Sequence, residues 1–180
     1  MEATSEHVVL VDTADRELGT AEKLAVHRDG RLHRAVSVFL FDEQGRWLLQ
    51  RRAEGKYHSP GLWSNTACTH PRLGEAPARA AARRLNEEMG VRCALQPAFA
   101  QVYRAELTGV ERLIEHELDH VFVGRFQGAP VPVAEEVSDW EWVAADALRA
   151  DVSARPRRYT PWFHIFRTDV AQAARELATV

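Results

Sequence analysis

The residues best suited to chemistry lie close together: Cys68 stands two positions before His70, and the adjacent glutamates Glu87 and Glu88 close a helical segment. Adjacent carboxylates repel each other, and they crowd the negative end of the helix dipole, where a cation is favoured. A bound divalent metal ion would remove both penalties, because hard cations take carboxylate oxygens as ligands. The alternative is that both glutamates are solvated and form ion pairs with the arginines one turn earlier, Arg83 and Arg84.

A second pair of carboxylates lies in residues 113–126. This segment alternates as a β-strand, so Glu115 and Glu117 point to one face of the strand while His116 points to the other. Carboxylates directed into a core are costly unless they are neutralised. The alternative is an exposed acidic strand at the edge of the sheet.

Basic residues follow a predicted strand in an irregular loop that contains Arg51, Arg52 and Lys56. A guanidinium group offers bidentate geometry to a phosphate, and an ammonium group offers a point charge. The loop is therefore suited to a diphosphate, although surface loops often carry such charges without a ligand.

Short apolar segments bounded by turn residues predict the strands that position these groups. They cover residues 8–11, 34–41, 46–51, 99–104, 113–126 and 140–143. Residues 42–45 predict a hairpin turn, because the sequence Asp-Glu-Gln-Gly ends in a glycine that tolerates positive φ. Residues 17–33 show turn signals at Gly19 and Gly30. They also contain His27 and His33, which taken singly are unremarkable.

Two helices are predicted in addition to a short helical turn at residues 146–150. The first begins near Pro77, which suits the first position of a helix, and ends at Gly90. The second begins at Pro161 with Thr160 as its N-cap, and it carries His164, which we interpret as structural. Strands and helices in this order indicate an α/β fold, an α/β/α sandwich around a mixed β-sheet.

Composition limits the possible partners and compartments. A chain of 180 residues with 46% apolar residues fits one domain, residues 1–180, and the polar residues 1–6 are expected to be poorly ordered. A net charge of −3 excludes a general attraction for nucleic acid or anionic membranes. The first twelve residues show no positively charged segment and no long apolar run, and no segment has about 18 consecutive apolar residues, so a cytoplasmic protein is expected. Its two cysteines, Cys68 and Cys93, are then free thiols.

Residues 69–91 resemble the Nudix signature. This sequence departs from the signature at two positions: Arg84 stands where the signature has a metal-binding glutamate, and Thr69 stands where it has a glycine. The positions in register are Glu75, Arg83, Leu85, Glu87, Glu88, Gly90 and Val91. The two departures resemble one branch of that fold, the type I isopentenyl-diphosphate delta-isomerases. So do the Cys-Thr-His-Pro segment at 68–71 and the Glu-His-Glu strand at 115–117. The resemblance covers most of the chain, from Glu22 and Lys23 through Trp162.

The resemblance implies one metal site built from three histidines and two glutamates, namely His27, His33, His70, Glu115 and Glu117. Nitrogen ligands mixed with oxygen ligands suit Mn²⁺, Zn²⁺ or iron(II) better than Mg²⁺ alone. The resemblance also implies that Glu88 binds a Mg²⁺ ion carried by the substrate diphosphate. The residues that match the phosphate-contacting positions of the family are Lys23, Arg52, Lys56 and Arg84.

The implied activity is the interconversion of isopentenyl and dimethylallyl diphosphates in isoprenoid biosynthesis. Moving the double bond requires that one proton is delivered to a terminal alkene carbon and another is removed from the allylic carbon. The resemblance assigns these steps to Cys68 and Glu117, with Tyr103 assisting proton delivery near Glu117. It also implies that the π face of Trp162 stabilises a carbocation.

Two other functions remain open at this point. A Nudix hydrolase that cleaves nucleoside diphosphate derivatives would need the dense acidic cluster that Arg84 interrupts. A Nudix-like binding module would use Cys68, His70 and other histidines to hold a structural zinc. For the isomerase, the expected partner is a small diphosphate, and the expected oligomeric state is a monomer.

Overall fold

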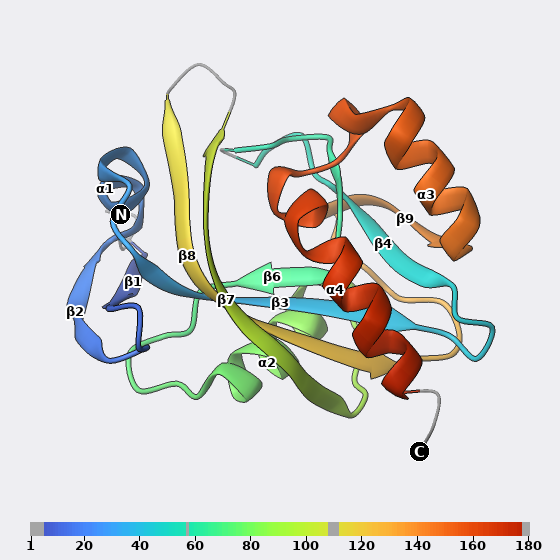
Figure 1. Ribbon diagram of the computed structural model, residues 1–180, viewed down its shortest axis with the longest axis horizontal. Helices are drawn as coiled ribbons and strands as arrows, with labels where there is room; N and C mark the ends of the chain where they lie inside the picture. Colours follow the sequence, from blue (N-terminus) through green and yellow to red (C-terminus); the bar gives the residue numbers. More distant parts are fainter. Residues whose placement is uncertain (1–5, 57, 108–111, 178–180) are drawn as a thin grey trace.

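A mixed β-sheet forms the centre of the computed structural model, which describes residues 6–56, 58–107 and 112–177 (Figure 1). The strands are β1 (His7–Val11), β2 (Glu17–Glu22), β3 (His33–Phe41), β4 (Trp47–Arg52), β5 (Trp63–Ser64), β6 (Ala67–Thr69), β7 (Leu95–Leu107), β8 (Leu113–Arg125) and β9 (Val137–Val143). The helices are α1 (Lys23–Asp29), α2 (Pro77–Met89), α3 (Ala145–Ala154), the 3-10 helix η1 (Pro156–Arg158) and α4 (Pro161–Leu177).

Strand β3 organises the sheet. Along one side it pairs in parallel with β8, in a register that places His33 opposite Glu117 and Phe41 opposite Arg125. Along the other side it pairs antiparallel with β1, β6 and β4 in turn, and Ser37 lies opposite Cys68 of β6. The register therefore brings residues of β6 and β8 to the two flanks of the same strand.

Alternate residues of β3 pack into two separate apolar layers. Phe39 and Phe41 belong to a cluster that includes Phe163 and Phe166 of α4, whereas Val38 and its alternate neighbours contact the apolar side of α2. Strand β3 is buried along its whole length, so this alternation reflects two cores rather than a core and a solvated face. Because α2 and α4 lie on opposite faces of the mixed sheet, the predicted α/β fold class is confirmed.

Several predicted elements differ from the observed ones. The segment from 17 to 33 contains a strand and a helix, β2 and α1, where the sequence predicts only turns; Gly30 ends α1 in the left-handed conformation. Strand β7 extends beyond the predicted residues 99–104 at both ends. Strand β8 is an interior strand between β3 and β7, so the alternative of an exposed acidic edge strand is excluded.

The expectation of poor order at residues 1–6 falls on residues 1–5 outside the described part of the chain. Glu6 is described, and its side chain pairs with Lys23 at 2.9 Å. None of the helices described is long and apolar enough to cross a lipid bilayer.

The ends of α2 agree with the sequence. Pro77 occupies its first turn, and Gly90 follows it with φ of 63°. The conformation of Gly90 is reinforced by close packing, because a Cβ atom there would lie 2.6 Å from the backbone oxygen of Val131. The position is therefore restricted to glycine twice over, by φ and by contact.

Replacing Gly90 with alanine should lower the free energy of unfolding more than the same change at Gly45. Gly45 also has positive φ, 72°, but a Cβ there would meet nothing within 4 Å. Gly45→Ala should cost about 1–2 kcal/mol from the left-handed backbone alone. Gly90→Ala should cost roughly 1–3 kcal/mol more, from the contact with Val131. Urea denaturation followed by circular dichroism measures both, and equal losses would contradict the steric argument.

Candidate metal centre and adjoining cavity

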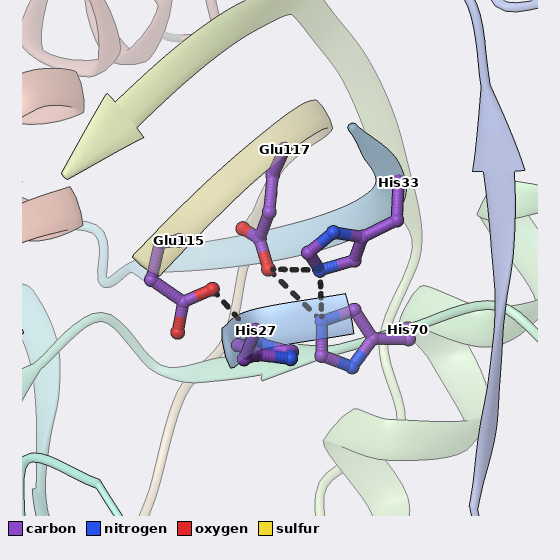
Figure 2. A group of neighbouring side chains, drawn as sticks. All are labelled: His27, His33, His70, Glu115 and Glu117. Atoms are coloured by element: carbon purple, nitrogen blue, oxygen red, sulfur yellow. Dashed lines mark hydrogen bonds and ion pairs between the residues drawn. The ribbon is translucent and has the colours of Figure 1, made fainter. Parts of the chain in front are cut away.

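Five potential metal ligands from separate parts of the chain meet at one end of the sheet (Figure 2). One ligand atom from each lies within 4.8 Å of every other. The residues are His27 of α1, His33 of β3, His70 just after β6, and Glu115 and Glu117 of β8. The parallel register of β3 and β8 accounts for part of this convergence, since it sets His33 directly beside Glu117.

The distances within the group are short. His70 Nε2 lies 2.9 Å from Glu117 Oε1 and 3.2 Å from His33 Nε2. His33 Nε2 lies 3.4 Å from the same oxygen of Glu117. On the other side of the group, His27 Nε2 lies 3.1 Å from Glu115 Oε2. The group thus consists of nitrogen and oxygen atoms directed toward a common centre.

Backbone carbonyls orient two of the imidazole rings. His27 Nδ1 donates to Lys23 O at 2.7 Å, and His33 Nδ1 donates to Arg31 O at 2.9 Å. A neutral ring that donates through Nδ1 presents the lone pair of Nε2, which is the usual arrangement of a metal-ligating histidine. Glu115 Oε2 is buried and has no well-aligned hydrogen bond among the described residues. The donor set therefore fits a divalent metal ion.

The electrostatics of the group are divided: the shifts at Glu117 and His70 favour ligation, whereas those at Glu115 and His27 oppose it, since Glu115 raises the pKa of His27 despite the opposing effect of burial. Burial and the charge of Glu117 raise the pKa of Glu115. Burial also raises the pKa of Glu117, but the interactions of its carboxylate with His33 and His70 hold that pKa well below its usual range. Burial lowers the pKa of His70 to about 3, so its ring is neutral at physiological pH. Neutral imidazoles and an ionised carboxylate are the forms that bind metals.

A cavity of about 450 Å³ adjoins the metal cluster, and Cys68, Tyr103, Glu117 and Trp162 all line it. Tyr103 is buried, and its hydroxyl donates to Glu117 Oε2 at 2.6 Å, so the oxygen not directed at the histidines is also held. Burial raises the pKa of Tyr103 well above its usual value, which keeps the phenol protonated as a donor. The predicted catalytic residues therefore share one cavity.

Cys68 lies on β6, on the opposite flank of β3 from Glu117. It is half-buried and free of disulfides. Its sulfur lies 3.9 Å from Arg52 Nη1. Burial, together with the charge of Glu88, raises the pKa of the thiol to about 12, although the nearby arginines act in the other direction. The thiol is therefore protonated at neutral pH.

The four predicted phosphate-binding cations line the same cavity, namely Lys23, Arg52, Lys56 and Arg84. Each has partners within the protein. Lys23 pairs with Glu6, and Glu136 bridges Lys56 and Arg84. Arg51, the other basic residue of the loop, instead donates to Gly61 O and does not line the cavity. All four positive charges therefore line the cavity, and Glu136 links two of them.

Glu88 also lines the cavity, and it is buried rather than solvated, with 1% of its surface exposed. Its Oε2 accepts a hydrogen bond from Gln50 at 2.7 Å, and its Oε1 lies 2.6 Å from Arg84 Nη2. The ion pairs of the alternative interpretation are thus present, and Arg83 also pairs with Glu87 at 3.0 Å. Burial of Glu88 nevertheless separates it from an ordinary surface glutamate.

Trp162 lines the cavity, and hydrogen bonds hold its ring in place. Its indole N–H donates to Ser64 Oγ at 2.9 Å and to Asn65 Oδ1 at 3.0 Å. The guanidinium carbon of Arg52 stands 5.4 Å from the ring centroid. The ring is therefore held by its edge and presents its face to positive charge.

Three further residues of the cavity were not anticipated from the sequence. His58 Nε2 lies 3.6 Å from Glu115 Oε1, and Glu136 holds two of the cations. Asp119 is buried and accepts a hydrogen bond from Ser37 Oγ at 2.7 Å; burial raises its pKa well above the usual value. The sequence carries a signal for Asp119, because it is the next residue after Glu117 on the same face of β8. His58 and Glu136 lie in loops, where no repeating sequence pattern predicts which way a side chain points.

Comparison with known proteins shows similarity in sequence and in fold. The NUDIX domain model matches residues 31–163. The chain is 55% identical over 157 residues to Isopentenyl-diphosphate Delta-isomerase 1 of Aromatoleum aromaticum, covering 87% of this chain and 88% of that protein. It is 51% identical over 159 residues to Isopentenyl-diphosphate Delta-isomerase of Burkholderia multivorans, covering 88% and 89%.

Two solved structures share the fold at low sequence identity. The Deinococcus radiodurans protein DR0079 superposes with a TM-score of 0.72 and 21% identity, over 95% of this chain and 98% of that chain. The MutT protein of Methanosarcina mazei Go1 superposes with a TM-score of 0.61 and 20% identity, over 81% and 95%. At this level of identity the likeness concerns the fold alone.

Proposed function

The chain belongs to the Nudix family and, within it, to the type I isopentenyl-diphosphate Delta-isomerases, and we propose how its residues perform the reaction of that family. The protein interconverts isopentenyl diphosphate and dimethylallyl diphosphate in isoprenoid biosynthesis. One observation supports the residue assignment most strongly. Cys68 and Glu117 enter a single cavity from the two strands that flank β3, beside the His/Glu cluster.

The reaction needs a proton donor and a proton acceptor on two sides of a flat five-carbon chain. Cys68 on one flank of β3 and Glu117 on the other meet this requirement. We assign the two proton transfers to them, one to each group, with the roles exchanged in the reverse direction. Tyr103, which donates to Glu117 Oε2, positions that carboxylate and assists its proton transfer.

Trp162 is proposed to stabilise the positive charge that develops on the hydrocarbon. A tertiary carbocation is attracted to the face of an indole ring as an ammonium or guanidinium group is. Trp162 already holds the guanidinium of Arg52 against its ring, and the hydrogen bonds of its N–H fix its orientation. The ring and the buried side chains around it exclude water from the reacting carbons.

The diphosphate is proposed to bind at the wall formed by Lys23, Arg52, Lys56 and Arg84. Glu136 now neutralises two of these cations, and a diphosphate would take over that role. Glu88 lies directly behind Arg84 and is proposed to hold a Mg²⁺ ion that accompanies the diphosphate. This placement requires Arg84 Nη2 to turn from the carboxylate toward a phosphate oxygen.

The His/Glu cluster is proposed to hold Mn²⁺ or Zn²⁺, because three imidazole nitrogens and two carboxylates suit those ions better than Mg²⁺. Such an ion supplies fixed positive charge beside Glu117, which keeps the carboxylate in place and favours its deprotonated form. We also propose that the protein acts as a cytoplasmic monomer. The two free cysteines fit a reducing compartment, and light scattering during gel filtration tests the oligomeric state.

One experiment distinguishes the proposed isomerase from a Nudix hydrolase. Purified protein with Mg²⁺ should exchange protons at C2 of isopentenyl diphosphate with deuterated water and form dimethylallyl diphosphate. Release of phosphate or nucleotide from nucleoside diphosphate derivatives, without isomerisation, would favour a hydrolase. A metal too tightly bound to exchange, with no response to diphosphates, would indicate a structural zinc module instead.

Replacing Tyr103 with phenylalanine should lower kcat about 10- to 100-fold. Hydrogen bonds to charged groups contribute about 1.5–3 kcal/mol, and each 1.4 kcal/mol corresponds to a factor of ten in rate. The fold should be retained, because phenylalanine keeps the edge contact with Phe166 at 5.2 Å. Steady-state isomerisation as a function of pH measures the effect. The pH profile of kcat should also shift, because the Glu117 carboxylate loses the hydrogen bond from Tyr103.

The matched control is Tyr159→Phe. The Tyr159 hydroxyl also donates to a carboxylate at 2.6 Å, that of Asp151, but it does not line the cavity. This variant should lose similar stability and keep its activity. Unchanged kcat and an unchanged pH profile in Tyr103→Phe would contradict the proposed role.

A further inference from the structure

A second cavity, of about 570 Å³, lies at the opposite end of β3 from the metal cluster. Its lining residues come from the turn between β3 and β4, from α3 and from the C-terminal half of α4. These elements lie on the right in Figure 1. Strand β3 begins at His33 in the metal cluster and ends at Phe41 in this cavity. At about 3.3 Å per residue, the two sites lie roughly 26 Å apart along the strand. The second cavity is therefore separate from the active site.

The inner wall of this cavity is apolar. Trp47 contributes from the start of β4, Leu148 and Val152 from α3, and Ala171 and Ala174 from α4. The two alanines lie three positions apart on one face of α4, so small side chains leave room where larger ones would fill the space. Such a wall accommodates a hydrocarbon or another apolar group.

The rim of the cavity is positively charged. Four arginines line it, namely Arg125, Arg149, Arg167 and Arg175. The acidic residues described in the lining are Asp42 and Glu43, and Asp42 is already engaged by Arg46 through its backbone N–H and its guanidinium. The excess of positive charge beside an apolar wall indicates a ligand with a negative end and an apolar end.

Among the arginines of this cavity, Arg167 gives the strongest indication of an anionic ligand. It is half-buried, and its guanidinium forms no hydrogen bond or ion pair with any of the described residues. Arg125 and Arg149 differ, since they donate to Asp42 O and to Asp146 Oδ1. A guanidinium stays charged at every accessible pH, and a buried donor without an acceptor is costly. An oxyanion in the cavity would supply the guanidinium of Arg167 with the partner that it lacks among the described residues.

We propose that this cavity binds an amphipathic anion, with a carboxylate or phosphate head at Arg167 and a hydrocarbon tail against the apolar wall. The head accepts hydrogen bonds from the guanidinium, and the tail packs between α3 and α4 beside Trp47. The site does not depend on the residues assigned to isomerisation. Its failure and the failure of the proposed catalytic assignment are therefore distinguishable.

Calorimetric titration of the full chain with decanoate, decyl phosphate and inorganic phosphate tests the proposal. Decanoate or decyl phosphate should bind, and the one that binds more tightly identifies the head group. Inorganic phosphate should bind at least tenfold more weakly than decyl phosphate, because it lacks the tail. Amide chemical shifts in the β3–β4 turn, α3 and α4 should change on binding.

Arg167→Gln should weaken binding of the better ligand at least tenfold, and isomerase activity should stay unchanged. The matched control is Arg157→Gln, since Arg157 is an exposed arginine that does not line the cavity. Ala174→Leu, which fills the cavity without altering charge, should also weaken binding. Absence of binding by both amphiphiles, equal binding of inorganic phosphate, or binding that Arg167→Gln leaves unaltered would overturn the proposal.

Discussion

Replacing Cys68 with alanine is expected to lower kcat for isomerisation by about 10³- to 10⁴-fold, the upper range for loss of a general acid–base group. Cys68 is the proton-transfer group that we assign on its flank of β3, across the cavity from Glu117. Alanine removes the sulfur and keeps the backbone pairing of β6 with Ser37, so the fold should be retained. Steady-state assays and deuterium exchange at C2 measure the loss.

The second cysteine supplies the control. Cys93 is also a free thiol, but it packs against the cluster under α2 and does not line the active-site cavity. Cys93→Ala should therefore keep ordinary activity. Substrate binding in Cys68→Ala should change little, because we propose that Lys23, Arg52, Lys56 and Arg84 hold the diphosphate. Ordinary turnover in Cys68→Ala would refute the acid–base assignment.

The sequence predicted that Glu115 and Glu117 point to one face of their strand, but it did not predict which residues they contact. The alternation of residues 113–126 places Glu115 and Glu117 on one face from local geometry alone. That His33 stands beside Glu117 depends on the parallel pairing of β3 with β8, between residues far apart in the chain. No period in the sequence encodes that pairing. The convergence of the five ligands was accessible only through the resemblance to a known family.

Helix α1 shows a second limit of local patterns. It is seven residues long, begins with Glu22 accepting from the backbone N–H groups of Leu24 and Ala25, and ends at Gly30. Gly19 and Gly30, close to such a short segment, are typical of turns. Isolated helices of this length are also unstable in water. The helix is stabilised by tertiary contacts with β8 and β2, and His27 reaches the metal cluster from it.

Arg84 illustrates how a departure from a signature alters chemistry. A Nudix hydrolase has a glutamate at this position, which adds to the acidic cluster that holds metal ions. Here Arg84 lies between Glu88 and Glu136 and neutralises both. The change reduces negative charge where a hydrolase concentrates it and places a cation where a diphosphate can bind. In the mechanism that we propose, Arg84 thus favours binding of the diphosphate over attack of water on it.

Replacing His70 with asparagine is expected to lower the affinity of the His/Glu cluster for Zn²⁺ or Mn²⁺ by at least about 100-fold, since loss of an outer-shell partner alone costs 10- to 100-fold. His70 Nε2 is the nitrogen nearest to Glu117 Oε1, at 2.9 Å, so its removal also releases the carboxylate. Isomerisation should fall with metal occupancy. Equilibrium dialysis followed by elemental analysis measures the metal content directly.

Stability gives an independent measurement of the same site. A metal ion that binds only the folded state, at 100 times its Kd, should raise the free energy of unfolding by about 2.7 kcal/mol. That increment should appear in the unaltered chain and vanish on chelation, whereas His70→Asn should show little of it. His164→Asn is the control, because His164 Nε2 donates to Pro156 O away from the cluster. If His70→Asn retained both its metal content and its stabilisation, the five side chains would not share one ion.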